Sequence, residues 1–305
     1  MRAEKLCYGS TIGLISPASA ENPDKIEQGI EYLKSLGFNV KSGEHIYDKW
    51  GYLAGSDKDR ASDLMNMFMD KDVDMILCIR GGYGTMRILP YIDFEIIREN
   101  PKIFAGFSDI TTLLNSIFQK CNLITFHSPM ATSNLSDPYT LKSFIDTLEN
   151  GYNPYTITNP EDIELVTSVP GTAKGRLAGG NLCLMASTLG TPYEVDTNDK
   201  ILFIEDVSEE PYSIDRMLTQ LLLAKKLQCC KGFILGQFKN CTLPNYERSL
   251  TLDEVIVDRI LSLKKPTVSN FMCGHSYPKL TLPIGANAVL DADKKEIKIT
   301  EAVVK

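Results

Sequence analysis

The sequence has no long hydrophobic run, no long basic run and no cysteine pair at metal-binding spacing. Without ~18 consecutive apolar residues, a transmembrane helix is not expected. The net charge of −7 over 305 residues disfavours nucleic acid and anionic membranes as main partners. The eight cysteines form no C-x-x-C pair, which argues against a zinc ribbon or a dithiol redox site. Several lie in apolar runs, so we expect reduced thiols that pack as small hydrophobic groups.

Recognised metal and phosphate motifs are also absent. No H-E-x-x-H or G-x-x-x-x-G-K-[ST] pattern occurs, so we expect neither a metal nor another cofactor. The first residues, Met1–Cys7, are polar, and the apolar stretch Thr11–Ser16 is too short for the core of a signal peptide. We therefore expect a cytoplasmic protein.

The first half of the chain alternates apolar runs with helical patterns. Its composition, 43% hydrophobic and 23% charged residues, is typical of a globular protein. Continuous apolar runs predict strands at 12–15, 74–79, 103–107 and 123–126. The spacing of apolar residues predicts helices at about 23–36, 57–69 and 110–119. This alternation predicts an α/β domain whose parallel sheet is covered on both faces.

A segment with several prolines separates this half from the rest. Residues from about Asn150 to Gly171 contain three prolines and few apolar runs, which predicts an interdomain connection. We place the boundary near 165, with an N-terminal domain of residues 1–165 and a C-terminal domain of residues 166–305. In the second domain we expect strands at 201–204 and 232–236, helices at 212–227 and 252–263, and a hairpin over 285–304.

Ser108 lies between an expected strand and an expected helix, in Gly106-Phe-Ser-Asp-Ile110. A serine at such a junction can project its hydroxyl above the strand ends, where free N–H groups of the new helix face an incoming carbonyl. The alternative is an ordinary N-cap, which is a common role for serine before a helix. Taken alone, the segment favours the cap.

A glycine-rich segment, Arg80-Gly-Gly-Tyr-Gly84, follows another expected strand. Glycines let the backbone approach a ligand closely and can direct N–H groups at an anion. One hypothesis is that the Gly82 N–H donates to an oxyanion beside Ser108. A tight turn between strand and helix explains the pattern equally well.

A serine hydrolase with a histidine base must use one of three histidines. His275 lies in a loop bounded by glycine and proline, His127 ends an expected strand, and His45 reads as a surface or packing residue. The residues themselves do not decide between His275 and His127.

Acidic residues follow the expected strand at 201–204. Glu205 or Asp206 could hold a histidine tautomer as the third member of a triad does, with Glu209 and Glu210 as close competitors. The alternative is a solvated turn carboxylate or a cap for the helix that follows.

Taken together, these segments resemble the serine LD-carboxypeptidases, also called muramoyltetrapeptide carboxypeptidases, a family that includes the microcin C immunity peptidases. The similar segments run through nearly the whole chain in a shared order and spacing. They are Ile15-Ser-Pro-Ala-Ser19, Gly51-Tyr-Leu-Ala-Gly-Ser-Asp57 with Arg60, Arg80-Gly-Gly-Tyr-Gly84, Gly106-Phe-Ser-Asp109, Gly179-Gly-Asn-Leu182, Gly190-Thr-Pro192, Ile204-Glu-Asp206, Gly274-His275 and Leu282-Pro-Ile-Gly285.

The resemblance implies a catalytic triad in which Ser108 is the nucleophile, His275 the general base and Glu205 the residue that orients the base. It also implies an oxyanion hole of backbone N–H groups, which we place at Asp109 and Gly82.

We further predict substrate-binding roles for Arg80, Gly81 and His127, although Arg80, a lysine or backbone groups could hold the substrate carboxylate. One departure from relatives is Ser128, which stands where they often have glycine.

For the fold, the resemblance implies an N-terminal domain similar to class I glutamine amidotransferases, a smaller C-terminal α/β domain, an active site between them, and homodimers. For the activity, it implies hydrolysis of the L,D-peptide bond that releases terminal D-alanine from a cell-wall tetrapeptide. The alternative is cleavage of a peptidyl-nucleotide toxin of the microcin C type. Such an enzyme is expected to carry an aromatic loop near the Glu205 strand that stacks on the nucleotide base. The only tryptophan, Trp50, is far from Glu205 in the sequence, although Tyr212 is near, which modestly disfavours this alternative. A third hypothesis, a nucleotide or phosphate binder, lacks a recognised phosphate motif.

Overall fold

The computed structural model describes residues 1–305, which form two compact units. The first unit comprises Met1–Asn153, Thr281–Gly285 and Ala302–Lys305, and the second comprises Pro154–Leu280 and Ala286–Glu301. The units thus change over near residue 153, whereas the sequence predicts a domain boundary near 165. Two short C-terminal segments also return to the first unit.

A six-stranded sheet forms the centre of the first unit. Its strands are β1 (Thr11–Ile15), β2 (Asn39–Ser42), β3 (Met75–Cys78), β4 (Ile103–Gly106), β5 (Thr125–His127) and β12 (Leu282–Ile284). Their order is β12-β5-β4-β3-β1-β2. All neighbours pair in parallel except β12, which is antiparallel to β5. The predicted parallel sheet is confirmed, and β2 is an edge strand whose exposed residues left no apolar run in the sequence.

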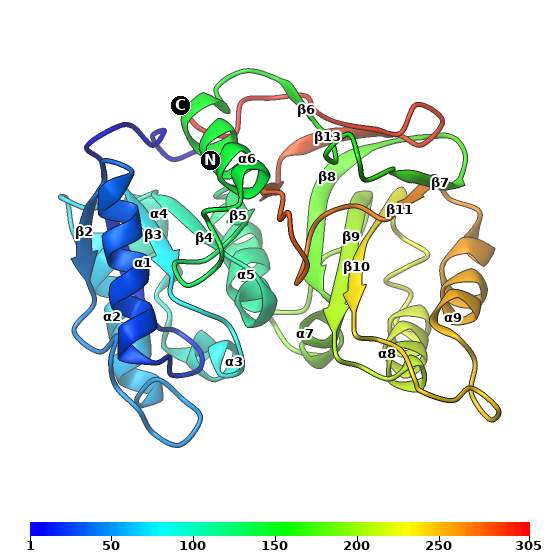
Figure 1. Ribbon diagram of the computed structural model, residues 1–305, viewed down its shortest axis with the longest axis horizontal. Helices are drawn as coiled ribbons and strands as arrows, with labels where there is room; N and C mark the ends of the chain where they lie inside the picture. Colours follow the sequence, from blue (N-terminus) through cyan, green and yellow to red (C-terminus); the bar gives the residue numbers. More distant parts are fainter. The chain divides into compact units, whose positions relative to one another are not determined.

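Helices surround this sheet. They are α1 (Pro23–Ser35), α2 (Asp57–Met69), α3 (Thr85–Ile88), α4 (Phe94–Glu99), α5 (Thr111–Cys121) and α6 (Pro138–Asn150). In Figure 1, α1 lies in front of the sheet and α4 lies behind it. Contacts join α2 to α4 and α4 to α5, so these three form one layer. The predicted helices at 23–36, 57–69 and 110–119 are confirmed to within about two residues.

Local capping sets where α1 and α2 begin. The Asn22 side chain accepts the N–H of Asp24, and Pro23 occupies the first helical position, where no N–H is needed. Ser56 accepts the N–H of Asp59 in the same way at the start of α2.

An eight-stranded sheet forms the second unit. Its strands are β6 (Tyr155–Ile157), β7 (Val166–Val169), β8 (Thr172–Asn181), β9 (Lys200–Val207), β10 (Gly232–Lys239), β11 (Thr267–Ser269), β13 (Asn287–Asp291) and β14 (Glu296–Ile299). Their order is β6-β14-β13-β8-β9-β10-β11-β7. The central strands β8, β9, β10 and β11 are parallel, and the flanking pairs are antiparallel. The predicted C-terminal hairpin is the β13–β14 pair.

Helices α7 (Leu182–Ser187), α8 (Pro211–Leu223) and α9 (Leu252–Arg259) belong to this unit. Their apolar side chains form one buried cluster with those of β9 and β10, including Met185, Leu218, Ile256 and Phe233. The predicted helices at 212–227 and 252–263 are confirmed, and both end earlier than expected.

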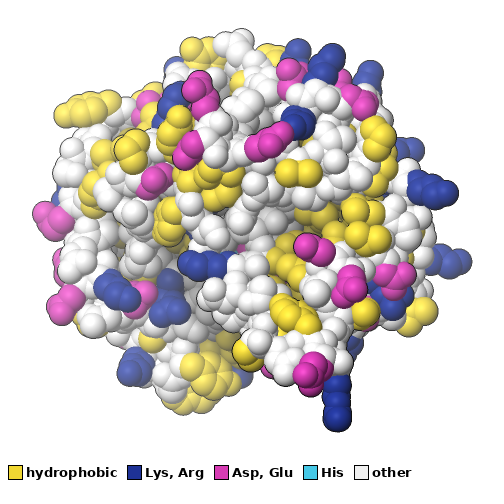
Figure 2. Space-filling view, turned by 45° about the vertical axis from the view of Figure 1, so that its right-hand side comes forward, with side chains coloured by type: hydrophobic (Ala, Val, Ile, Leu, Met, Phe, Trp, Pro, Cys, Tyr) yellow, Lys and Arg dark blue, Asp and Glu magenta, His cyan; other side chains and the backbone are white.

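In each unit, taken by itself, polar residues of interest lie at the carboxyl ends of parallel strands. Ser108 follows β4, the Arg80–Gly84 segment follows β3, and Glu205 lies near the end of β9. This edge is the usual ligand side of an open parallel sheet. The face shown in Figure 2 carries interspersed acidic and basic side chains instead of one broad basic surface. No helix has both the length and the apolar character needed to cross a membrane.

Candidate active site

Ser108 stands on a strained turn between β4 and α5. Phe107 is extended, Ser108 has φ 64°, and a short 3₁₀ helix at Ser108–Ile110 leads into α5. The N-cap position of that 3₁₀ helix is Phe107, so the alternative interpretation of Ser108 as an ordinary cap is wrong. A non-glycine residue in the left-handed region between strand and helix is the geometry of a nucleophile elbow.

This backbone conformation yields a stability prediction. The free energy of unfolding of Ser108→Gly is expected to be about 1 kcal/mol higher than that of Ser108→Ala, because only glycine adopts a positive φ without steric cost. Denaturant unfolding of the two variants measures the difference. At Ser116, inside α5, the same pair is expected to show the opposite order, since glycine weakens a helix interior. Equal stability of the two Ser108 variants would contradict the strained turn.

The glycine-rich segment lies against this turn. A Cβ added to Gly81 would lie 2.9 Å from Ser108 Cβ and 3.3 Å from the Asp109 nitrogen. A Cβ added to Gly82, where φ is 111°, would lie 2.3 Å from Ser19 Oγ. Side chains at either position would therefore push the segment away from Ser108 or from Ser19.

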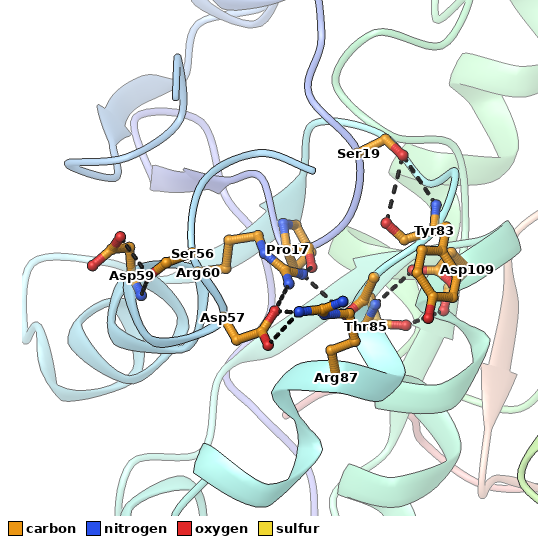
Figure 3. A network of polar contacts seen from close by, with 11 residues as sticks. Pro17, Ser19, Ser56, Asp57, Asp59, Arg60, Tyr83, Thr85, Arg87 and Asp109 are labelled. Atoms are coloured by element: carbon orange, nitrogen blue, oxygen red, sulfur yellow. Dashed lines mark hydrogen bonds and ion pairs between the residues drawn. The ribbon is translucent and has the colours of Figure 1, made fainter. Parts of the chain in front are cut away.

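Asp109 connects the turn to the start of α3. Its Oδ2 accepts the Thr85 N–H at 2.8 Å, and Thr85 Oγ1 donates to the Asp109 carbonyl at 2.6 Å (Figure 3). Burial raises the pKa of the Asp109 carboxyl to about 6, although the Thr85 hydrogen bonds and Arg60 oppose the shift. The carboxyl thus supports the loop, while its own backbone N–H is the group predicted for the oxyanion hole.

Two further predicted residues differ in accessibility. The Arg80 side chain is partly exposed and pairs with Glu21 at 3.5 Å. His127, at the end of β5, is fully buried, and its ring packs edge-on against Phe107 with centroids 5.9 Å apart. His127 therefore lies in the core of the first unit, where packing accounts for it, and a substrate-binding role for it stays a prediction.

In the second unit, Glu205 and His275 are hydrogen-bonded. Glu205 Oε2 lies 2.7 Å from His275 Nδ1, and the Glu205 side chain is fully buried whereas that of His275 is 18% exposed. A carboxylate at Nδ1 orients the ring and leaves Nε2 able to accept a proton. Of the two histidines that the sequence left open, His275 is the one that this acid orients.

Two glycines lie against the Glu205 side chain, and one of them leaves room for its carboxylate. A Cβ on Gly274, where φ is 112°, would lie 2.6 Å from Glu205 Oε2. A Cβ on Gly236 would lie 3.2 Å from Glu205 Cβ. The glycine before His275 is thus required for the close approach of this loop to β9.

Asp206, the acid next to Glu205, has other partners. Asp206 accepts from Asn181 Nδ2 at 3.0 Å and from the Cys183 and Val207 N–H groups at 3.0 and 2.8 Å. Burial raises the pKa of Asp206 to about 6, and these hydrogen bonds oppose the shift. Glu210 is the N-cap residue of α8. Asp206 therefore holds the start of α7 and does not take the place of Glu205.

Lys279 is a site residue that the sequence did not indicate. It is 1% exposed, and its ammonium donates to the carbonyl of Gly274, the residue before His275. Burial lowers the pKa of Lys279 to about 7, while the nearby Glu205 carboxylate acts in the opposite direction. A single lysine in a loop carries no signal of burial in the sequence, because lysine is ordinarily exposed.

The Lys279 ammonium makes stability depend on pH. Between about pH 7 and 10.5 the unfolded chain holds the Lys279 proton that the folded chain has released, so the free energy of unfolding rises with pH in this window. Relative to Lys279→Met, the wild-type protein is expected to gain up to about 1.4 kcal/mol per pH unit there. Urea unfolding of both proteins across the window measures this gain. A difference that does not change with pH would disprove the assignment.

One group of possible metal ligands lies away from these residues. The ligand atoms of His45, Asp48 and Asp59 are within 4.8 Å of one another. His45 Nδ1 is 2.9 Å from Asp48 Oδ2, and Asp59 accepts from Ser56. These polar contacts explain the group without an ion.

Comparison with known proteins identifies the family. The chain matches the LD-carboxypeptidase N-terminal domain over residues 12–128 and the LD-carboxypeptidase C-terminal domain over residues 174–290. A probable murein peptide carboxypeptidase of Bacillus subtilis is 43% identical over 99% of this chain and 95% of its own length. The microcin C7 self-immunity protein MccF superposes with a TM-score of 0.90 at 28% identity, with both chains covered completely. A muramoyltetrapeptide carboxypeptidase from Oxalobacter formigenes superposes with a TM-score of 0.83 at 28% identity, over 95% of this chain and 97% of that one. The chain therefore belongs to the LD-carboxypeptidase family of peptidases.

Proposed function

We propose that this protein is a serine carboxypeptidase that releases terminal D-alanine from murein tetrapeptide by hydrolysing an L,D-peptide bond. The observation that carries the proposal is the 2.7 Å hydrogen bond between the buried Glu205 carboxylate and His275 Nδ1. The strained turn at Ser108 supplies a nucleophile of the matching type. The substrate follows from the 43% identical relative, whose name assigns it to murein peptide.

In the proposed reaction, Ser108 attacks the carbonyl of the residue before D-alanine. His275 Nε2 takes the serine proton and then donates it to the leaving amine, and a water molecule later hydrolyses the acyl-enzyme. Glu205 stabilises the imidazolium that forms in each step. The N–H groups of Asp109 and Gly82 would each lower the barrier by roughly 3–4 kcal/mol if they bind the oxyanion. Arg80, Gly81 and His127 are the residues proposed to bind the rest of the substrate.

This proposal requires that the two units bring the Ser108 hydroxyl and the His275 imidazole together. The predicted domains, residues 1–165 and 166–305, would then contribute the nucleophile and the Glu–His pair respectively. We also propose that the first domain is related to class I glutamine amidotransferases, that the active form is a homodimer and that it works in the cytoplasm. Light scattering of the purified protein tests the dimer.

Mass spectrometry after incubation with a defined tetrapeptide tests the activity. The proposal expects loss of one alanine from a tetrapeptide that ends in D-alanine and no loss from the epimer that ends in L-alanine. Release from both epimers would contradict the L,D-specificity, and release from neither would contradict the substrate.

A second candidate substrate is an aminoacyl nucleotide of the microcin C type. The complete superposition on the self-immunity protein MccF favours it. Parallel measurement of kcat/KM on the tetrapeptide and on an aspartyl-adenylate analogue separates the two. We expect the tetrapeptide to be preferred, because the murein peptide carboxypeptidase of Bacillus subtilis is more similar in sequence to this chain (43% identity) than MccF is (28%).

A further inference from the structure

Arg60 is one of the residues that resemble the LD-carboxypeptidase family, but the proposed reaction gives it no role. Its side chain extends from α2 and is fully buried. Arg60 Nη1 donates to the Pro17 carbonyl at 2.5 Å and to the Gly84 carbonyl at 2.9 Å. Arg60 Nη2 forms an ion pair with Asp57. Figure 3 shows the Arg60 guanidinium with Pro17 and Asp57.

The two carbonyls belong to loops that meet beside the nucleophile. The loop after β1 continues to Ser19, whose N–H donates to the Gly81 carbonyl at 3.3 Å and whose Oγ accepts the Tyr83 N–H at 3.1 Å. Gly84 closes the glycine-rich segment, and a Cβ there would lie 2.8 Å from Arg60 Nη1. One guanidinium nitrogen therefore joins the loop after β1 to the loop after β3.

The other side of the glycine-rich segment faces the catalytic turn. Gly81 leaves no room for a Cβ beside Ser108, and the Thr85 N–H donates to Asp109 at 2.8 Å. A displacement of the segment would consequently change the position of its N–H groups relative to Ser108. Misplacement by about 1 Å can lower a catalytic rate about 10²-fold.

Burial of the Arg60 guanidinium carries a desolvation cost. Burial lowers the pKa of Arg60, and the Asp57 carboxylate opposes that effect. Asp57 is itself held by Arg87, which donates to its two oxygens at 2.8 and 3.0 Å. An apolar side chain would avoid the desolvation cost but would leave the Pro17 and Gly84 carbonyls without these donors. The arrangement therefore serves the geometry of the two loops.

We propose that Arg60 is a positioning residue of the active site, which fixes the glycine-rich segment beside Ser108 by holding the Pro17 and Gly84 carbonyls. This inference rests on the proposed function, since it assumes that Ser108 is the nucleophile and that the glycine-rich segment receives the oxyanion. A planar guanidinium can bind two carbonyls and a carboxylate at once, whereas an ammonium is a point charge with less directional control.

Kinetics of Arg60→Met and Arg60→Lys test the inference. Arg60→Met is expected to lower kcat for the tetrapeptide about 10²-fold with KM changed less than about 3-fold, because the loop moves while most substrate contacts persist. Arg60→Lys is expected to recover part of kcat, since lysine can still donate to both carbonyls. If Arg60→Met does not fold, the comparison of Arg60→Lys with wild type carries the test, with a decrease in kcat expected.

Lys102→Met is the matched control. Lys102 is also a buried cation of the first unit that donates to two backbone carbonyls, those of Asp70 and Val73, but it precedes β4 and lies at the opposite end of this strand from Ser108. Both Met variants are expected to lose stability, and only Arg60→Met is expected to lose kcat. A wild-type protein without peptidase activity would refute the proposed function. An active wild type, with Arg60 variants that keep its kcat or that lose no more than Lys102→Met, would overturn the role of Arg60 alone.

The rate of Ser108 modification by a fluorophosphonate gives a readout that does not depend on the peptide. When Ser108 attacks the reagent, negative charge develops on a phosphonate oxygen, and the same N–H groups donate hydrogen bonds to that oxygen. Labelling of Arg60→Met is therefore expected to slow about as much as kcat. Labelling at the wild-type rate would contradict the positioning role.

Discussion

Replacement of Ser108 by alanine is expected to lower kcat for murein tetrapeptide by roughly 10⁴- to 10⁶-fold. The alanine variant retains the backbone turn and the surrounding N–H groups but has no oxygen to form the acyl-enzyme. Because only a hydroxyl is removed, circular dichroism and the unfolding midpoint are expected to remain close to those of the wild type. Single-turnover assays with mass-spectrometric detection of D-alanine measure the loss.

The control for this variant is Ser116→Ala. Ser116 is a buried serine of α5, a little over two turns after Ser108, and its hydroxyl has no hydrogen-bond partner. Its replacement is expected to leave kcat within about 3-fold of wild type, as for a side chain that takes no part in the chemistry. Near-normal turnover by Ser108→Ala would exclude Ser108 as the nucleophile.

Replacement of Glu205 by glutamine is the second large effect, with an expected loss of about 10³- to 10⁴-fold in kcat. A carboxylate accepts the Nδ1 proton of His275 and leaves Nε2 as the base, whereas the amide of glutamine can donate to Nδ1 and stabilise the wrong tautomer. The amide also lacks the negative charge that stabilises the imidazolium. Steady-state kinetics together with the unfolding midpoint separate this catalytic loss from a loss of fold.

Asp206→Asn provides a demanding control, because Asp206 is the next residue of β9 and is almost as buried. Its carboxylate accepts from the N–H groups of Cys183 and Val207, so the variant is expected to be less stable without the loss of about three orders of magnitude in kcat. If Asp206→Asn lost as much kcat as Glu205→Gln at a temperature where both remain folded, Glu205 would not be the specific partner of the base.

The position of Ser108 between a strand and a helix was predictable because its signals are local. An apolar run before the serine and a helical pattern after it place the hydroxyl at a strand end, and these patterns need only neighbouring residues. The positive φ of Ser108 was not predictable, since serine rarely adopts it and its surroundings enforce it here.

The residues alone did not choose between the two histidines; the family resemblance pointed to His275, and the tertiary structure shows how their surroundings differ. His127 and His275 are equally plausible bases in the sequence, but His127 pairs within the sheet between β4 and β12 and is fully buried. His275 meets a carboxylate that is 70 residues away in the chain. No local pattern encodes that contact.

Edge strands were the main error in the fold. The stretch from Asn150 to Gly171 was predicted to be a connection, but it contains β6 and β7, which pair with β14 and β11. Both are short and largely half-exposed, so they show no apolar run, and pairing with distant strands stabilises them. The return of β12 to the first sheet was also missed, because this buried strand has only three residues and pairs with a strand far away in the sequence.

The sequence by itself determined the α/β class, the order of the central strands and helices along the chain, and a short set of candidate groups. These properties depend on the spacing of apolar residues and on glycine positions within about ten residues, so they are local patterns of the sequence. The family resemblance had already paired Glu205 with His275, but only the tertiary structure showed their hydrogen bond, the support of α7 by Asp206 and the burial of Arg60 and Lys279 against backbone carbonyls. Charged side chains are buried only where partners compensate for the lost water, and for Arg60 those include the Pro17 and Gly84 carbonyls, which only the folded chain brings to it.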